Sequence, residues 1–399
     1  MEPADPSEPI RSADVGSFPW TVLHDRHPAL LQQVREAHPY PPDRRAAIDD
    51  LEREIAGTIE PLTDTAADAP TWASWAAEYL GQSWYDVPFL WAENYFYRKL
   101  LGAVGYLEPG PWYGIDPFEP LKSAELAGPI VDAELAALDG LAELTPDQRL
   151  DRLLWAALWG NRADLSFGVG GGPAGVQTDH LVVDDRAELR RLLAGGGLGL
   201  VVLVADNAGR ELQPDLVLID HLLDTGVAAE VVLHVKPRPY FVSDATGADV
   251  LAAIRRLNTP AAGSSASTVI GRRLWAALEA GRLTVRADPF SIAPLNYPDL
   301  PPTGSSQSAS SQLAADLAAA DLTIMKGDLN YRRLVGDRDW PATSSFADRT
   351  SYLPGPVVAL RTLKSNVVVG LDPAVLAELD ATGTAWRVSG GYGLVQLRR

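Results

Sequence analysis

The second half of the chain alternates short, almost wholly apolar runs with longer segments of helical pattern, and this alternation limits the possible folds more than any other feature. Two clear apolar runs are LGLVVLVA (198–205) and EVVLHV (230–235). The segment ELQPDLVLIDHLLDTG (211–226) between them has apolar residues three or four positions apart, as a helix would. Apolar strands separated by helices are typical of a mostly parallel sheet that is covered on both faces. We therefore predict a three-layer α/β/α domain over residues 166–399.

The pattern predicts further strands in the same domain. DLTIM (321–325) follows a helical segment, GPVVALRTLKSNVVVGL (355–371) is strand-like along its length, and AWRVSGGYGLVQLRR (385–399) is expected to close the sheet. The Ser-rich run TGSSQSASSQ (303–312) is predicted to be a surface loop within the domain.

The first half of the chain is predicted to be helical. Segments such as HPALLQQVREAH (27–38) carry apolar residues at helical spacing, and Thr145 followed by Pro146 is a strong signal for the start of a helix. Residues 1–16 are acidic and rich in proline, so we expect a flexible arm there. The sequence thus predicts a helical domain over residues 17–165 that packs on the α/β/α domain.

Composition excludes several classes of function. The 399 residues include no cysteine, so disulfides, thiolate metal sites and thiol nucleophiles are absent. The net charge of −18 argues against a nucleic-acid or anionic-membrane partner, because those surfaces are bound through clustered cations. A few local basic residues are still enough to bind a small phosphorylated ligand. Since there is no targeting segment and no long apolar run, we expect a soluble cytoplasmic protein, and no protein partner is predicted.

Polar side chains follow three of the predicted strands. Asp206 and Asn207 come directly after the first apolar run, Asp244 closes the next strand-and-turn unit, and KGDLNYRRL (326–334) follows DLTIM. Because open α/β sheets bind ligands at the carboxyl ends of their strands, these three ends are expected to share one crevice. Carboxylate and carboxamide oxygens suit Mg²⁺ or Mn²⁺ in metal-assisted phosphoryl chemistry. The alternative is that Asp206 and Asp244 only cap the helices that follow them.

Basic residues near the same strand ends are candidates for a phosphate-binding group. A site that holds a metal and a phosphate needs cations for the phosphate oxygens that the metal does not contact. Five such residues are present, namely Lys326, Arg332, Arg333, Arg361 and Lys364. Exposed basic side chains are usually only solvated, so the spacing alone leaves both interpretations open.

The motifs of several other enzyme classes are missing or out of context. GGGPAG (170–175), within the glycine-rich GVGGGPAG (168–175), matches the dinucleotide fingerprint, but no apolar strand precedes it and no helical pattern follows. The chain has no GK[ST], no G-x-S-x-G and no H-E-x-x-H. The sequence therefore does not support a P-loop, a serine-hydrolase elbow or a zinc-protease helix.

Several long stretches resemble the DUF89 damage-control phosphatases, and among them the ARMT1-like subfamily, once described as protein-glutamate O-methyltransferases. The stretches occur in family order and span residues 17–375; they are ENYFYRKL (93–100), DPFEPLK (116–122), LWGNRADLS (158–166), DNAGREL (206–212), HVKPRPYFVSD (234–244), KGDLNYRRL (326–334) and RTLK (361–364). RTLK fits the R-T-x-K motif that marks this subfamily.

The resemblance implies a metal-dependent phosphatase that acts on small phosphometabolites such as fructose 1-phosphate or fructose 6-phosphate. It places the metal ligands, which are also the catalytic residues, at Asp206, Asn207 and Asp244. Mn²⁺ is the metal that it favours, with Ni²⁺, Co²⁺ or Mg²⁺ as alternatives. The candidate substrate-binding residues are Asp206, Asn207, Glu211, Lys326, Asp328, Asn330, Tyr331, Arg332 and Lys364.

Two other functions are compatible with the sequence. The first is an S-adenosylmethionine-dependent protein-glutamate carboxyl methyltransferase, for which Glu211 and Asp244, together with Arg26, match positions that contact the cofactor. The second is a sugar-phosphate sensor without turnover. Methyl transfer needs no cluster of metal ligands, and a complete ligand set argues against a pure sensor. One departure from the family is Arg210, where relatives often carry a large apolar residue at the rim of the pocket.

Overall fold

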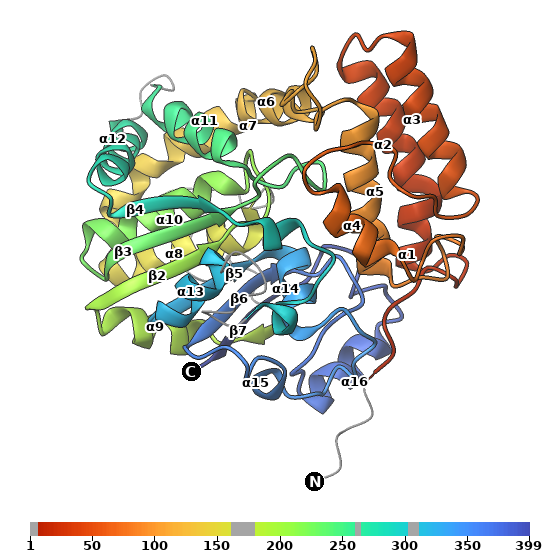
Figure 1. The fold of residues 1–399 in the computed structure, drawn as a ribbon. Coiled ribbons are helices and arrows are strands. Elements are labelled where there is room, and N and C mark those ends of the chain that lie inside the picture. Colours follow the sequence, from red (N-terminus) through yellow and green to blue (C-terminus); the bar gives the residue numbers. More distant parts are fainter. Residues whose placement is uncertain (1–6, 161–179, 260–264, 302–310) are drawn as a thin grey trace.

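A seven-stranded sheet lies at the centre of the molecule (Figure 1). The computed structural model describes residues 7–160, 180–259, 265–301 and 311–399, and the strand order within them is β1-β7-β6-β5-β2-β3-β4. Neighbouring strands are parallel except for β6 and β7, which confirms the predicted, mostly parallel sheet. The strands are β1 (Leu181–Asp184), β2 (Leu198–Val204), β3 (Ala228–Val235), β4 (Leu283–Ala287), β5 (Leu322–Lys326), β6 (Val357–Thr362) and β7 (Gly393–Arg398).

Strand β2 shows why both faces of the sheet must be covered. Val201 and Leu203 lie in one hydrophobic core, whereas Val202 and Val204 lie in another. Successive side chains of a strand point to opposite faces, so an uninterrupted apolar run needs a hydrophobic layer on each side. The run that the sequence predicts as a buried strand is therefore an interior strand of a three-layer α/β/α arrangement.

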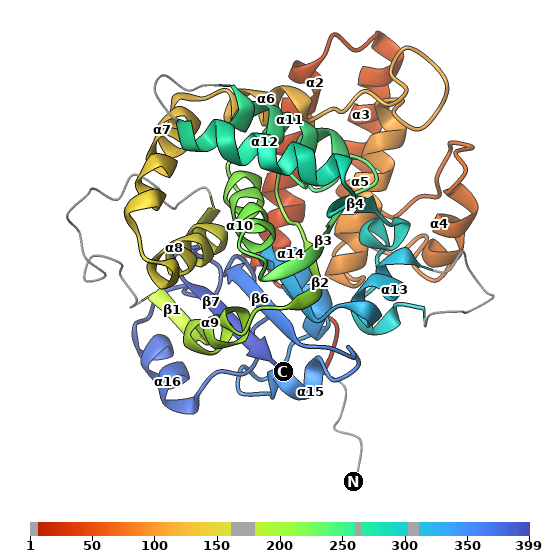
Figure 2. The same ribbon diagram turned by 90° about the vertical axis from the view of Figure 1, so that its left-hand side faces the viewer.

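Two sets of helices supply these layers (Figures 1 and 2). The first core joins the sheet to α7 (Pro129–Ala137), the 3-10 helix η2 (Leu138–Glu143), α8 (Pro146–Trp159), α9 (Arg186–Ala194), α10 (Leu212–Asp224), α11 (Gly247–Asn258) and α12 (Ser265–Glu279). The second core joins its other face to α13 (Gln312–Ala319), α14 (Gly327–Val335), α15 (Phe346–Arg349) and α16 (Pro373–Ala381).

A third core, rich in aromatic residues, belongs to the N-terminal helical region. Its buried members include Trp72, Trp84 and Tyr95, and it also contains Tyr240 and Ile292 from the α/β part, so the two parts pack together directly. The helices of this region are α1 (Phe18–Thr21), a π-helical turn (Val22–Arg26), α2 (His27–Ala37), α3 (Pro42–Ile55), α4 (Ala69–Ala76) and α5 (Phe89–Ala103), and α6 (Glu119–Leu126) follows them.

Helix α8 confirms the start signal in the sequence. Thr145 caps its first turn, with its side chain accepting from the backbone N–H of Gln148 and the Gln148 side chain accepting in return. Although α7 and α8 lie within the predicted helical domain, both belong to the first core rather than to the aromatic core, and α8 contacts β6 and β7 of the sheet. The division of the chain at residue 165 stays a prediction.

The N-terminal arm is attached where the structure describes it. The backbone oxygen of Ile10 accepts from the N–H of Phe89 at 2.7 Å, and the N–H of Ser12 donates to the oxygen of Tyr85 at 3.1 Å. Ser12 is fully buried. Ile10 and Ser12 thus hold the arm against the start of α5 and the turn before it.

The segment 355–371 is a strand only in its first half. Strand β6 ends at Thr362, and 367–371 runs through the second core without joining the sheet. Its backbone finds other partners, since Gly370 and Leu371 donate to loop carbonyls and the Val367 oxygen accepts from the Arg361 guanidinium. The expectation of one long strand was wrong for this reason.

Two sequence features lie outside the described residues. These are the glycine-rich segment 168–175 and most of the Ser-rich run, whose described end leads into α13. Within the described ranges, no helix is both long and apolar enough to cross a membrane.

Candidate active site

The candidate site lies at the point where the strand order reverses. Strands β3 and β4 lie on one side of β2, and β5 and β6 lie on the other, so the carboxyl ends of β2 and β5 flank the switch point of the sheet. Asp206 and Asn207 follow β2, and Asp328 follows β5 at the start of α14. Open α/β sheets bind their ligands at such a point, because the connecting loops diverge there and leave a crevice.

Asp206 is buried against the backbone of the neighbouring strand end. Its side chain lies beside Gly327, which has a φ of 83° and whose Cβ, if present, would overlap the Asp206 carboxylate. Only glycine tolerates both the positive φ and the close approach. The Asp206 backbone oxygen also accepts from the N–H of Ala245 at 2.9 Å, which ties this strand end to the segment that carries Asp244.

Asn207 connects the candidate ligands to one another. Asn207 and Asp244 form an isolated antiparallel bridge, and the Asn207 Oδ1 accepts from the Ser243 hydroxyl at 2.6 Å. Its Nδ2 donates to Asp206 Oδ2 at 3.1 Å and to Glu211 Oε2 at 3.0 Å. The structure thus brings Asp206, Asn207, Glu211 and Asp244 together, although they come from two different strand ends.

Negative charge in this group is buried and only partly balanced. Burial, with repulsion from Glu211 and Asp244, raises the pKa of Asp206 well above its usual range. Burial also raises the pKa of Asp244. It opposes ionisation of Glu211 too, but the positive charges of Lys326 and Lys364 and a hydrogen bond from Asn207 lower the pKa of that carboxyl overall. A cation placed among these groups would favour their ionised forms.

Two buried lysines hold the segment that carries Asp244. Lys236 Nζ lies 3.4 Å from Asp244 Oδ2, and Lys122 Nζ donates to the Asp244 backbone oxygen at 3.1 Å. Lys122 is also paired with Asp116 and Asp249. Sequence reasoning missed both lysines as site residues, although each lies within a stretch that carries the family resemblance.

The donor set fits a hard divalent cation. In the described part of the chain, no three His, Cys, Asp or Glu side chains are arranged to hold a metal ion. The set that the family resemblance implies consists instead of two carboxylates and one carboxamide, from Asp206, Asp244 and Asn207. Asp244 Oδ2 is buried, and apart from its ion pair with Lys236 at 3.4 Å it has no hydrogen-bond partner among the described residues. Oxygen ligands in this number leave positions for water and a phosphate oxygen, as Mg²⁺ and Mn²⁺ sites do. Their role as ligands stays a prediction.

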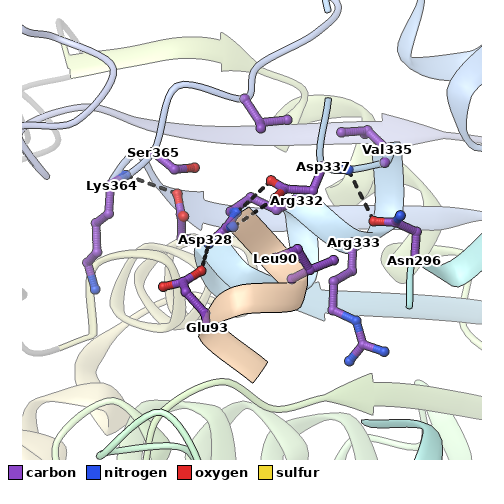
Figure 3. A network of polar contacts seen from close by, with 12 residues as sticks. Leu90, Glu93, Asn296, Asp328, Arg332, Arg333, Val335, Asp337, Lys364 and Ser365 are labelled. Atoms are coloured by element: carbon purple, nitrogen blue, oxygen red, sulfur yellow. Dashed lines mark hydrogen bonds and ion pairs between the residues drawn. The ribbon is translucent and has the colours of Figure 1, made fainter. Parts of the chain in front are cut away.

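Asp328 joins the start of α14 to the RTLK segment (Figure 3). Its Oδ1 accepts from Arg361 Nε at 2.9 Å and from the backbone N–H of Lys364 at 3.0 Å. Burial opposes ionisation of Asp328, but the charges of Arg361 and Arg332 outweigh it and lower the pKa of the carboxyl. An ionised Asp328 thus fixes the position of the Lys364 backbone.

Other predicted substrate-binding residues on α14 make contacts inside the protein. Asn330 donates to the backbone oxygens of Ala205 and Lys326, both at 2.9 Å, so it ties α14 to the end of β2. The Tyr331 hydroxyl donates to Gln396 Oε1 at 3.0 Å, and the Arg361 guanidinium carbon lies 4.2 Å from the centre of the Tyr331 ring. These contacts position the strand ends, and direct contact with substrate stays a prediction.

Four of the five predicted cations are buried and bonded to groups inside the protein, namely Lys326, Arg332, Arg333 and Arg361. Lys326 forms an ion pair with Asp215 at 2.9 Å. Arg332 binds Glu93 and Asp337, and Arg333 donates to three backbone oxygens. Lys364 differs from them, because it is half-buried and its charge acts on both Asp206 and Glu211.

The remaining candidates are Arg210 and Arg26, whose side chains contact residues other than the candidate ligands. Arg210 pairs with Glu134 of α7, with its Nε donating at 3.0 Å, so the departure from the family is accommodated by an ion pair. Arg26 is exposed, and its guanidinium lies 5.2 Å from the centre of the Phe18 ring.

Glu93 of α5 is a buried acid that sequence reasoning did not single out. Its Oε2 accepts from Arg332 Nη1 at 2.8 Å (Figure 3). Burial raises its pKa to about 7 in spite of this partner. The helical region therefore reaches the element that carries the predicted substrate-binding residues. Two signals in the sequence pointed to it: Glu93 begins the stretch ENYFYRKL, which carries the family resemblance, and it is a charged residue in a mostly apolar helix start, FLWAENYF.

The chain is similar to several known proteins. Residues 22–379 match the damage-control phosphatase ARMT1-like domain. The damage-control phosphatase ARMT1 of Xenopus laevis is 30% identical over 98% of this chain and 99% of its own length, and that of Homo sapiens is 27% identical over 97% of both chains. A crystal structure of a DUF89 family protein from Pyrococcus horikoshii matches 95% of this chain and 98% of its own with 18% identity and a TM-score of 0.48.

Proposed function

The chain belongs to the ARMT1-like damage-control phosphatase family and is a phosphatase, and on that basis we propose that it hydrolyses sugar phosphates such as fructose 1-phosphate or fructose 6-phosphate. We place the reaction at the carboxyl ends of β2, β3 and β5, where the candidate ligands come together. The observation that supports this location is the group of buried carboxylates around Asn207 at the switch point of the sheet. The nearby positive charges only partly balance the negative charge of these carboxylates.

The family is metal-dependent, and the proposed ligands are Asp206, Asn207 and Asp244. When bound, a divalent ion, in our proposal Mn²⁺, would act as a Lewis acid on the phosphoryl group and on the attacking water. Ser243 and Glu211 keep the Asn207 carboxamide oriented through their hydrogen bonds. Burial of the group excludes bulk water, which strengthens each charge interaction within it.

The phosphate-binding part of the proposal is the Lys364 side chain. Its backbone is fixed by Asp328, and its charge acts on the carboxylates of Asp206 and Glu211. A lysine beside these carboxylates would bind the phosphate oxygens that face away from the metal ligands. Glu211 and Asp328 are the acids best placed to hold or move a proton near the substrate.

A phosphate-release screen tests the proposal. The purified protein is incubated with a panel of sugar phosphates and with Mn²⁺, Co²⁺, Ni²⁺ or Mg²⁺ in turn, and inorganic phosphate is measured. We expect release that depends on the metal and is fastest with a fructose phosphate. If hexose phosphates are untouched under every metal while other phosphate esters are cleaved, the proposed substrates are wrong and the enzyme class stands.

A further inference from the structure

The segment that presents Asp244 has an unfavourable backbone conformation. Just before it, Phe241 and Val242 have φ angles of 42° and 66°, and they are the described non-glycine residues with positive φ. A β-branched residue such as valine rarely adopts this conformation, which persists only where surrounding contacts impose it. Contacts from elsewhere in the fold must therefore hold residues 236–244 in place.

The strongest of these contacts comes from helix α5 of the N-terminal helical region. The hydroxyl of Tyr240 lies 2.9 Å from Asn94 Oδ1, 3.1 Å from the Asn94 backbone oxygen and 3.0 Å from the oxygen of Ile292. Asn94 Nδ2 donates to the Leu90 oxygen at 2.6 Å, which fixes the orientation of its carboxamide. Tyr240 and Asn94 are each 1% exposed, so water cannot replace either partner.

Two flanking contacts join the same segment to the same region. The ring of Phe241 stacks on Tyr97 of α5 with 4.6 Å between the ring centres. Arg238 pairs with Asp68, which is also bound by the buried Arg98 of α5. The helical region therefore holds the segment at three points before the candidate ligand, namely Arg238, Tyr240 and Phe241.

We propose that Tyr240 and Asn94 are positioning residues that set the geometry of Asp244 for metal binding, so that the helical region forms part of the metal site without contacting the metal. This inference rests on the proposed metal site. Asp244 follows Tyr240 by four residues, and its backbone N–H donates to the Tyr240 oxygen at 3.2 Å, so a shift of Tyr240 moves the ligand. Loss of a group that orients a metal ligand typically lowers metal affinity about ten- to hundred-fold.

The substitution Tyr240→Phe tests this, with Tyr95→Phe as the matched control. Tyr95 lies on α5 next to Asn94, is fully buried, and donates its hydroxyl to the backbone oxygen of Glu60 at 2.9 Å. Each variant therefore loses one buried hydroxyl, but only Tyr240 is joined to the Asp244 segment. Mn²⁺ affinity is measured by calorimetry on the full chain, and the melting temperature without metal is measured beside it.

We expect Tyr240→Phe to weaken Mn²⁺ binding about ten-fold or more, and Tyr95→Phe to leave it within about two-fold at a similar loss of melting temperature. Asn94→Ala should weaken binding as well, and the double variant should lose less than the sum of both effects. Equal Mn²⁺ affinity in the parent and Tyr240→Phe would overturn the inference alone. A parent protein that binds no Mn²⁺ would instead overturn the proposed metal site.

Discussion

Gly327 is the residue at which one added carbon atom would reach the candidate metal site. Its φ of 83° and its contact with the Asp206 carboxylate both exclude a side chain. We expect Gly327→Ala to weaken Mn²⁺ binding about ten-fold or more, because the carboxylate must move. Gly383 is the matched control, since its φ of 65° is similar but a Cβ there would meet open space.

Both alanine variants carry the backbone strain of a positive φ, about 1–3 kcal/mol of unfolding free energy. Only the Gly327 variant should lose metal affinity, as measured by calorimetry. Equal metal affinity in the two variants would show that the Asp206 carboxylate is not a ligand, or that it has room to move aside.

Lys364 is the residue that separates phosphate binding from metal binding. We expect Lys364→Ala to lower kcat/KM for sugar phosphates about ten- to hundred-fold, because one charge-assisted contact is lost in a partly buried site. Mn²⁺ binding by calorimetry should be unchanged within about two-fold. A variant that loses metal affinity, or that turns over at the parent rate, would contradict this division of roles.

At the scale of elements, the contact between α5 and α14 makes stability depend on pH. The pKa of Glu93 is raised by burial from 4.5 to about 7 in the folded protein. An acid with a raised folded pKa contributes stability that is present below about pH 4.5 and is lost as pH rises through about 7. Glu93→Gln cannot titrate, so the variant should lack this loss.

Denaturant unfolding at several pH values measures the effect. The free energy of unfolding of the parent, relative to Glu93→Gln, should fall between about pH 4.5 and 7 and be level on either side. If the free energies of unfolding of the parent and of Glu93→Gln stay parallel across that window, Glu93 keeps its ordinary pKa. The charge of Arg332 would then offset the effect of burial on the pKa of Glu93.

The elements themselves were largely predictable from local pattern. The apolar run of β2, the helices α2 and α8 and the cap at Thr145 all follow from residue spacing and chain-local chemistry. The exception at 355–371 arises because Arg361 and two loops satisfy backbone groups that a strand would have paired. Side-chain partners of this kind are invisible in a hydrophobic pattern.

The candidate ligands were predictable for the same local reason, since polar residues directly after apolar strands mark a ligand-binding edge. The groups that support them were not. Lys122 lies 122 positions from Asp244, and Glu93 lies 239 positions from Arg332. A buried charge is recognisable only from its partner, and nothing in the spacing of either residue indicates which partner it meets.

Across the whole molecule, the site is shared by the two parts of the fold. The sheet supplies the candidate ligands, and α5 of the helical region contacts both the segment that carries Asp244 and the element that carries Asp328. Separate domains joined by a loop could not impose such contacts. We therefore expect the α/β part to bind metal poorly without the helices, because the segment before Asp244 would relax.

The most direct test of the proposed metal site compares metal-dependent phosphate release in Asp206→Ala, Asp244→Ala and the control Asp321→Ala. Asp321 is also a carboxylate next to a strand, but it precedes β5 and so lies at the amino end of that strand, where it accepts from the backbone N–H groups of Gly199 and Leu200. With Mn²⁺ and a fructose phosphate, we expect both site variants to lose activity while folding normally, and the control to lose only thermal stability. If Asp206→Ala and Asp244→Ala keep the turnover of the parent and lose stability as Asp321→Ala does, these carboxylates are structural caps and the proposed metal site is wrong.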